Sequence, residues 1–255
     1  MEKINRKSFQ GVGNIVQFNW HFYAVAFFIV LVLSFTKKYL PFYMSFIANT
    51  AIVFTIITTF ISLLASYYIY DYSDLYTLKW LDFLNIKDNT TIVNINAGFD
   101  ETSSILQDKF PNTKLIVLDF YDASKHTEIS IERARKAYPV FPNTINIRTD
   151  SISLQANSVD YIFLIFAAHE IRNEVERILF FKQLRSILKD DGKIIVTEHQ
   201  RDLPNFIAYT IGFFHFYANK TWKKIFTQSE LSIEKEFKIN PFVTTFILTK
   251  NGITP

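Results

Sequence analysis

Two long uncharged stretches dominate the N-terminal third of the chain. No residue from Ser8 to Thr36 or from Tyr39 to Tyr70 carries a formal charge, and Lys37 and Lys38 separate the two stretches. About 20 consecutive apolar residues are enough for a helix to cross the hydrocarbon core of a bilayer. The pattern therefore predicts a transmembrane helical hairpin. We place its two spans at about residues 15–36 and 42–69.

Two other interpretations of these stretches fit the residues less well. A cleavable signal peptide would have a shorter apolar core than Phe22–Phe35, followed by a small-x-small cleavage site. Two buried helices of a soluble protein would be apolar on one side only, whereas Ala24–Leu33 is apolar on every face. Aromatic residues also stand near the ends of each stretch, where interfacial belts are expected: Trp20, Tyr23, Tyr39, Tyr43, Tyr67, Tyr68, Tyr70 and Tyr72.

Basic residues flank the first stretch on both sides. Lys3, Arg6 and Lys7 precede it, which favours a cytoplasmic N-terminus by the positive-inside rule. Two crossings return the chain to the same side, so we expect a multi-pass membrane protein with a cytoplasmic globular domain. The net charge of +3 belongs to this anchor, and the nearly neutral remainder argues against nucleic-acid binding. The absence of cysteine excludes disulfides, thiolate nucleophiles and cysteine metal sites.

The rest of the chain alternates between strand-like and helix-like segments. Runs rich in Ile, Val and Leu predict strands at Thr91–Asn96, Lys114–Asp119, Asn143–Thr149, Val159–Phe166 and Lys193–Glu198. Helices are expected at Glu101–Phe110, Thr127–Tyr138 and Glu174–Leu188. The alternation of strands and helices ends with two strands joined by a tight turn, Ile233–Ile239 and Phe242–Thr249. This pattern predicts an α/β fold, with a Rossmann-like seven-stranded, mostly parallel sheet and a C-terminal antiparallel hairpin.

The chain thus divides into three parts. Residues 1–72 hold the transmembrane hairpin, residues 73–90 connect it, and residues 91–255 form the α/β domain. The connection includes a short amphipathic helix at Leu78–Leu84.

The loop after the first strand is the best candidate for a cofactor site. It has the position of a nucleotide-binding loop but keeps only Gly98. Asp119 ends the second strand 21 residues later, which is the spacing of a ribose-binding carboxylate. A nicotinamide oxidoreductase would need a fuller glycine fingerprint than the single Gly98 of this loop. In the alternative, purely structural interpretation, Gly98 and Asp100 form a turn and a helix cap, and Asp119 caps a loop.

These segments resemble the class I S-adenosylmethionine-dependent methyltransferases from about Lys79 to Lys250. In the family's acid-x-Gly-x-Gly loop, Asn94 takes the acidic position, while Asn96 and Gly98 take the glycine positions and Asp100 follows. Three later runs also resemble family segments, at residues 154–160, 166–171 and 184–193. The resemblance implies S-adenosylmethionine as cofactor. It implies cofactor contacts at Asn94, Asn96, Ala97, Gly98, Asp100, Asp119, Phe120, Asp150, Ser151 and Phe166.

Several of these roles have a physical basis. S-adenosylmethionine has no phosphate, so it needs fewer bare amides than a dinucleotide does. Asn96 can adopt a left-handed conformation, and Asp100 can cap the next helix. His169 and Glu170 follow the fourth strand and are the candidate catalytic residues, with His169 as a general base. We predict no metal site, and His199 and His215 are expected to be packed or surface histidines.

One segment bears on the substrate. Leu203–Asn219 is uncharged and rich in aromatic residues, and Lys220, Lys223 and Lys224 follow it. It is either an ordinary core helix or an apolar lid at the membrane surface. We therefore expect a membrane-anchored methyltransferase whose partners are the lipid bilayer and a hydrophobic small-molecule acceptor. The alternative is a catalytically inactive membrane scaffold or cofactor sensor that keeps the methyltransferase fold.

Overall fold

The predicted sheet is present in the computed structural model, which describes residues 6–125 and 128–250. Within these residues, seven strands form one sheet in the order β3-β2-β1-β4-β5-β7-β6. The strands are β1 (Thr91–Asn96), β2 (Lys114–Asp119), β3 (Ile145–Asn146), β4 (Val159–Ile165), β5 (Leu188–His199), β6 (Leu231–Asn240) and β7 (Val243–Lys250). The first five strands are parallel, and β7 lies antiparallel between β5 and β6. The predicted fold class is confirmed.

Successive residues of a strand point to opposite faces of the sheet. Both faces carry apolar side chains here, and helices cover both. On one face, Val93 and Ile95 pack with apolar side chains of α6 (Glu174–Ile187) and α8 (Asn219–Gln228). On the other face, Ile92 packs with α4 (Ser103–Lys109) and with the 3₁₀ helix η3 (Lys79–Leu84). The strand order reverses between β1 and β4. Ligands of such sheets bind at this reversal, beyond the carboxyl ends of the strands.

Several predicted elements differ in extent. The third strand shrinks to two residues, because it lies at the edge and pairs only with Leu118 and Asp119 of β2 within the described chain. Helix α5 (Ile129–Ala137) starts later than predicted, and Thr127 lies outside the described residues. The expected turn at Gly192 is a bulge inside β5. A Cβ there would lie 2.8 Å from the Leu188 side chain, so glycine is needed for close packing.

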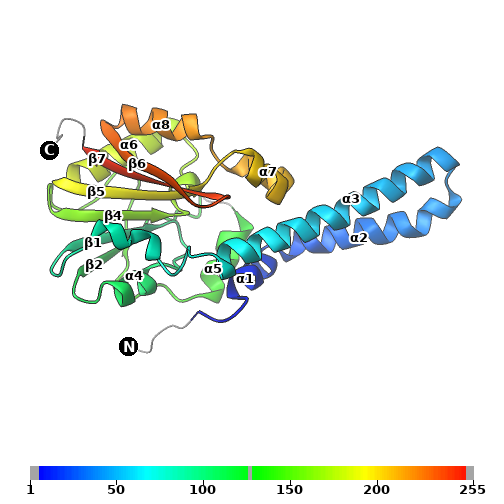
Figure 1. Ribbon diagram of the computed structural model, residues 1–255, viewed down its shortest axis with the longest axis horizontal. Coiled ribbons are helices and arrows are strands. Elements are labelled where there is room, and N and C mark those ends of the chain that lie inside the picture. The colour runs from blue at the N-terminus through cyan, green and yellow to red at the C-terminus, as the bar shows by residue number, and fades with distance from the viewer. Residues whose placement is uncertain (1–5, 126–127, 251–255) are drawn as a thin grey trace.

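The N-terminal apolar stretches form an antiparallel helical hairpin that projects from the sheet domain (Figure 1). Its arms are α2 (Trp20–Thr36) and α3 (Phe42–Tyr67), joined through the 3₁₀ turn η1 (Lys37–Tyr39). A π-helical turn, η2 (Tyr68–Tyr72), extends α3. Within the described residues, these two helices are long and apolar enough to cross a membrane, by length and composition. The most apolar window of each is 0% and 6% buried, so neither is a core helix of this fold.

A separate helix, α1 (Gln10–Phe18), fixes the base of the hairpin to the sheet domain. The chain bends at Asn19, so the first apolar arm begins at Trp20 rather than near residue 15. Asp71 accepts hydrogen bonds from the first-turn amides of Gly11 and Val12, at 2.7 and 2.8 Å. Negative charge at a helix N-terminus is stabilising, and this contact ties the end of the second arm to the start of α1.

Candidate active site

The loop after β1 is shaped by its own polar side chains. Gly98 has φ of +98°, a conformation that L-residues avoid, and a Cβ there would lie 2.8 Å from the Tyr121 ring. Asn96 Oδ1 accepts a hydrogen bond from the Gly98 amide at 3.0 Å. Asp100 Oδ1 accepts from the amides of Thr102 and Ser103, at 3.0 and 2.9 Å. The predicted capping role of Asp100 is confirmed, whereas Asn96 is an extended strand residue and not left-handed.

Three buried polar atoms of this loop find no hydrogen-bond partner within residues 6–125 and 128–250. They are Asn94 Oδ1, Asn96 Nδ2 and Asp100 Oδ2. Asn96 and Asp100 both line a cavity at the carboxyl end of β1. Buried polar groups are normally paired, so unpaired ones here point to a ligand or to solvent. A free amide donor beside a free carboxylate acceptor suits a ligand that carries both a carboxylate and an ammonium group.

The carboxylate of Asp119 is already bound within the protein. Its Oδ2 accepts a hydrogen bond from Arg135 Nη1 at 2.6 Å, and its Oδ1 accepts from the Tyr121 amide at 2.9 Å. Arg135 also donates to the Gly98 carbonyl at 3.2 Å and stacks over the Tyr121 ring. With Arg135 in this position the cavity measures about 20 Å³, which is the space of one water molecule. A nucleoside can enter only when Arg135 moves away from Asp119.

The other predicted cofactor residues take different positions. Asp150 is exposed and forms a bidentate ion pair with Arg148, at 2.8 and 2.6 Å, and Ser151 is exposed beside it. Phe120 is buried in the core and packs edge-on against Phe180. Ala97 is also buried. Phe166, at φ of +53°, stacks on the His199 ring at 4.8 Å instead of lining this cavity.

Sequence reasoning missed five residues of the cavity wall. Arg135 lies on α5, Tyr138, Pro139 and Val140 follow that helix, and Phe99 comes from the loop itself. Phe99 contacts Tyr138 at 5.3 Å and Phe18 of α1 at 5.5 Å, so the N-terminal helix closes this side of the loop. No short-range pattern marks these contacts. The one sequence signal concerns Arg135, which is a basic residue on α5, the helix that follows β2 and its terminal Asp119.

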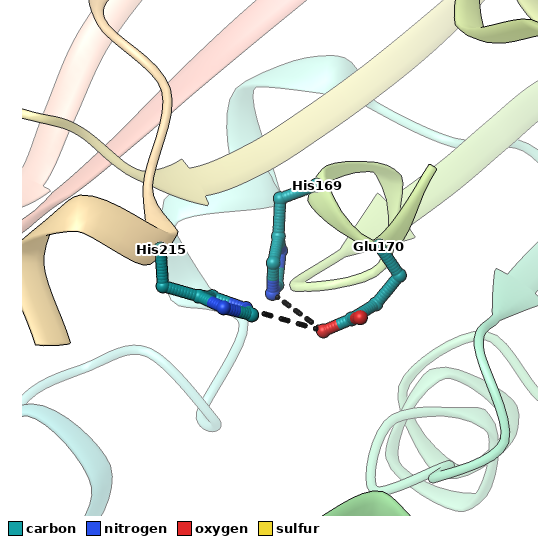
Figure 2. Close-up of side chains that lie close together, drawn as sticks. All are labelled: His169, Glu170 and His215. Carbon is teal, nitrogen blue, oxygen red and sulfur yellow. Dashed lines mark ion pairs between the residues drawn. The ribbon is translucent and has the colours of Figure 1, made fainter. Parts of the chain in front are cut away.

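A second group of chemically active side chains gathers beyond β4 and β5 (Figure 2). His169 and Glu170 lie on the 3₁₀ turn η4 (Ala168–Glu170), and His215 ends the 3₁₀ helix η5 (Thr210–His215). Glu170 Oε1 lies 3.0 Å from His169 Nε2 and 3.4 Å from His215 Nε2. On its other side, His169 Nδ1 lies 2.7 Å from Oε2 of Glu198, at the end of β5.

The two carboxylates determine the charge of His169. Burial lowers the pKa of this imidazole, but Glu198 and Glu170 more than offset the effect and raise the pKa to about 10. Burial raises the pKa of Glu170, yet His169 and His215 hold it well below its usual range. A histidine that keeps both ring protons at neutral pH is a hydrogen-bond donor. These contacts therefore argue against the predicted role of His169 as a general base.

His199 has the opposite surroundings, although it follows Glu198 directly. Its Nδ1 lies 3.1 Å from the Phe242 carbonyl, so Nδ1 carries the proton and donates it. Its Nε2 lies 2.8 Å from the Tyr70 hydroxyl and accepts from it. Burial lowers the pKa of His199 to about 4. His199 is thus a neutral packed histidine, as predicted, whereas His215 belongs to the cluster with His169.

A larger cavity, of about 360 Å³, lies just beyond the end of β5, beside β6 and β7. Its wall comes from the end of β5 and from β6 and β7, and it includes the buried Gln200. Asp202 and Lys238 in this wall form an ion pair at 2.8 Å. The sequence did not mark this cavity, and it contains none of the predicted cofactor residues.

Comparison with solved structures identifies the fold as that of the class I methyltransferases. A methyltransferase from Aquifex aeolicus described as S-adenosylmethionine-dependent is 15% identical, with a TM-score of 0.50 over 75% of this chain and 97% of that one. Another so described, from Methanosarcina mazei, is 14% identical, with a TM-score of 0.50 over 67% and 97%. A protein from Pyrococcus horikoshii is 15% identical, with a TM-score of 0.51 over 69% and 88%. At these identities the likeness shows the fold alone. Neither a family model nor a curated protein matches the chain.

Proposed function

We propose that this protein is a membrane-anchored S-adenosylmethionine-dependent methyltransferase that acts on a hydrophobic or membrane-associated small molecule. The observation that carries the proposal is the polar edge at the strand reversal. There Asn96 and Asp100, each with an unpaired buried side-chain atom, line one cavity, Gly98 leaves room for close backbone approach, and Asp119 ends the neighbouring strand. These groups match the carboxylate, ammonium and ribose hydroxyls of the cofactor.

Each residue would have a distinct task. Asn96 donates to the amino-acid carboxylate, Asp100 accepts from the ammonium group, and Asp119 accepts from the ribose once Arg135 has moved. When bound, the cofactor supplies a methyl group on a positively charged sulfur, which is already activated for displacement. Holding donor and acceptor in line can supply most of the rate, so the reaction does not need His169 as a base.

The membrane part of the proposal rests on exposed apolar surface. Both arms of the hairpin expose large apolar side chains along their length. A second surface, which we call the aromatic patch, lies on α7 (Leu203–Tyr209) and η5. Figure 1 shows α7 on the side of the domain from which the hairpin projects. The aromatic patch consists of residues that are 48% to 84% exposed: Leu203, Phe206, Ile207, Ile211 and Phe214.

This position of the patch favours the lid interpretation over an ordinary core helix. Helix α7 contacts α3, so the patch lies on an element that packs against the hairpin. An apolar surface of this kind lies at the headgroup boundary in interfacial proteins. An acceptor dissolved in the bilayer would then reach the domain without crossing water.

Calorimetry tests cofactor binding directly. Full-length protein in detergent is titrated with S-adenosylmethionine and S-adenosylhomocysteine, and we expect saturable binding of one ligand per chain. A folded sample that binds neither at millimolar concentration would exclude the enzyme. Binding without methyl transfer to any fraction of a lipid extract would instead support a cofactor sensor. The Arg135–Asp119 ion pair, which keeps the cavity closed, is the observation that favours that second function.

Site-directed labelling tests the membrane placement. Because the chain has no native cysteine, single-cysteine variants report one position each. In nanodiscs, we expect a spin label at Ile211→Cys to be quenched by lipid-soluble relaxation agents, and one at Lys136→Cys to be quenched by water-soluble agents. In cells, an impermeant thiol reagent should reach Lys38→Cys from outside and should not reach Lys136→Cys. The reverse accessibility would contradict a cytoplasmic domain.

A further inference from the structure

Two histidines and one carboxylate converge from separate elements of the fold. His169 Nε2 and His215 Nε2 both face Glu170 Oε1, at 3.0 and 3.4 Å (Figure 2). Donor atoms of all three side chains lie within 4.8 Å of one another. The three side chains come from η4 and η5, which are 40 residues or more apart in the chain, so tertiary packing brings them together.

We propose that this cluster binds a divalent transition-metal ion through His169 Nε2, the Glu170 carboxylate and His215 Nε2. The ion displaces the proton of His169 Nε2, which leaves to solvent, while Nδ1 keeps its proton toward Glu198. Ligands about 2.1 Å from a tetrahedral ion lie about 3.4 Å from one another. The two measured separations are close to this value. Small side-chain rotations therefore suffice to admit the ion, and the backbone can stay where it is.

Both histidines have a carboxylate on the ring nitrogen that faces away from Glu170. His169 Nδ1 lies 2.7 Å from Glu198 Oε2, and His215 Nδ1 lies 2.8 Å from Glu128 Oε1. Metal-binding histidines commonly donate their second N–H to a carboxylate, which fixes the tautomer and the ring orientation. Here that arrangement leaves both Nε2 atoms directed at the same oxygen. A histidine that merely packs in a core needs no such pair of outer carboxylates.

The local charge also favours a dication. Glu170, Glu198 and Glu128 surround the cluster, and Arg172 is the one arginine in contact with it among the described residues. Arg172 Nη2 lies 2.5 Å from His215 Nε2 and 4.0 Å from Glu170 Oε2, so it now fills part of the space that the ion would take. Its side chain is 41% exposed and can turn toward solvent. Because His215 is 26% exposed, the same movement opens a path for the ion.

The donor set defines the class of metal. Two imidazole nitrogens with one carboxylate suit Zn²⁺, Fe²⁺ or Co²⁺ better than Mg²⁺ or Ca²⁺, which prefer oxygen ligands. Three protein ligands also leave a coordination position open, as in catalytic zinc sites. That position would take a hydroxyl or carboxylate oxygen of the acceptor. This last step rests on the proposed function, whereas metal binding itself does not.

Calorimetry on the full-length protein tests the site without any cofactor present. Detergent-purified protein is freed of metal with EDTA, dialysed and titrated with ZnCl₂, and CoCl₂ is followed by its visible absorption. We expect one Zn²⁺ per chain. Glu170→Gln and His215→Gln should each weaken binding by more than about 100-fold, and Glu198→Gln by about 10- to 100-fold, because it acts through His169. The matched control is His21→Gln, which removes a histidine outside the cluster and should bind Zn²⁺ as the wild type does.

Arg172→Ala keeps the test decisive if a ligand variant does not fold. It removes no ligand but does remove the competing cation, so Zn²⁺ affinity should rise by about tenfold. Two results would overturn the site: a folded wild type that takes up no stoichiometric Zn²⁺ or Co²⁺, or Glu170→Gln and His215→Gln proteins that bind Zn²⁺ as tightly as the wild type. Since no S-adenosylmethionine is present, a failure of the proposed methyltransferase function leaves the metal titration unchanged.

Discussion

Two sites along the carboxyl edge of the same sheet handle buried charge in different ways. Beyond β1 and β2, the carboxylate of Asp119 is matched by one arginine, Arg135, and the cavity between them is closed. Beyond β4 and β5, three carboxylates gather around His169 and His215, with Arg172 at the side. At the first site the ion pair of Asp119 and Arg135 is neutral, and the cavity beside it must open to bind a ligand. The second carries an excess of negative charge, which a positively charged ligand would neutralise.

Protonation of His199 should have a large effect on stability. Its folded pKa of about 4 lies below the unfolded value, so its contribution to stability is complete above pH 6.5 and is lost as pH falls toward 4. The loss amounts to about 3 kcal/mol. Denaturant unfolding of the detergent-solubilised protein at several pH values in EDTA measures it. His199→Gln, which can keep both hydrogen bonds, should abolish this slope, and an unchanged slope would contradict a neutral His199.

The raised pKa of His169 predicts the opposite slope in the same measurement. A histidine with a folded pKa of about 10 stabilises the protein fully below pH 6.5, and the contribution is lost as pH rises through 10. We expect His169→Gln to remove the alkaline slope and to leave the acid slope in place. If both variants changed the pH dependence of stability over the same pH range, the two histidines would not be in opposite charge states.

At the cavity after β1, Asp119→Ala should weaken binding of S-adenosylmethionine by about 30-fold or more. The reason is the loss of a charged acceptor for the ribose, worth about 2 kcal/mol. Lys136→Ala is the control, because Lys136 lies on the same helix as Arg135 but pairs at the surface with Glu132. Calorimetric affinities that are equal for the two variants would show that Asp119 does not bind the cofactor.

Arg135→Ala tests whether the closed cavity opposes binding. Removing the side chain frees Asp119 and enlarges the cavity, so the affinity for S-adenosylmethionine should rise by about three- to tenfold. Thermal stability should fall, because a buried carboxylate loses its partner. Both quantities can be measured on one preparation. A fall in affinity would show instead that Arg135 itself holds the cofactor.

Asp150→Ala should have the smallest effect. The carboxylate is exposed and paired with Arg148, and exposed ion pairs contribute little. We expect the affinity for S-adenosylmethionine to stay within about twofold of the wild type in the same titration. A loss comparable to that of Asp119→Ala would restore the cofactor contact of Asp150 that the family resemblance implied.

The elements were predictable where the residue pattern alone sets them. The short runs of β1, β2 and β4 are apolar because both faces of the sheet are covered, and that pattern is local in the sequence. The bend at Asn19 and the two-residue β3 were not predictable. The bend separates the two arms from α1, whose position depends on Asp71, and β3 depends on pairing at one end of β2.

The site was predictable only in part, for a related reason. Asn96 and Asp119 end strands and Gly98 follows β1 by two residues, so their position at one sheet edge follows from strand order. Arg135 approaches from α5, and its contact with Asp119 depends on how that helix packs. His169 was marked by its position after β4, but Glu128 and His215 reach it from distant loops. Their involvement could not be predicted from spacing.

The sequence by itself determined the fold class, the two apolar helices and the position of the loop after β1, because hydrophobic periodicity and strand-end residues are local properties. The tertiary structure decided which charges meet. It placed Arg135 against Asp119, which closes the cavity after β1. It also brought His215 to Glu170 and Glu128 to His215 at the site after β4 and β5. Electrostatic partners are chosen by distance in space. Residues that are far apart in the chain thus determine whether a histidine is a base, a cation or a metal ligand.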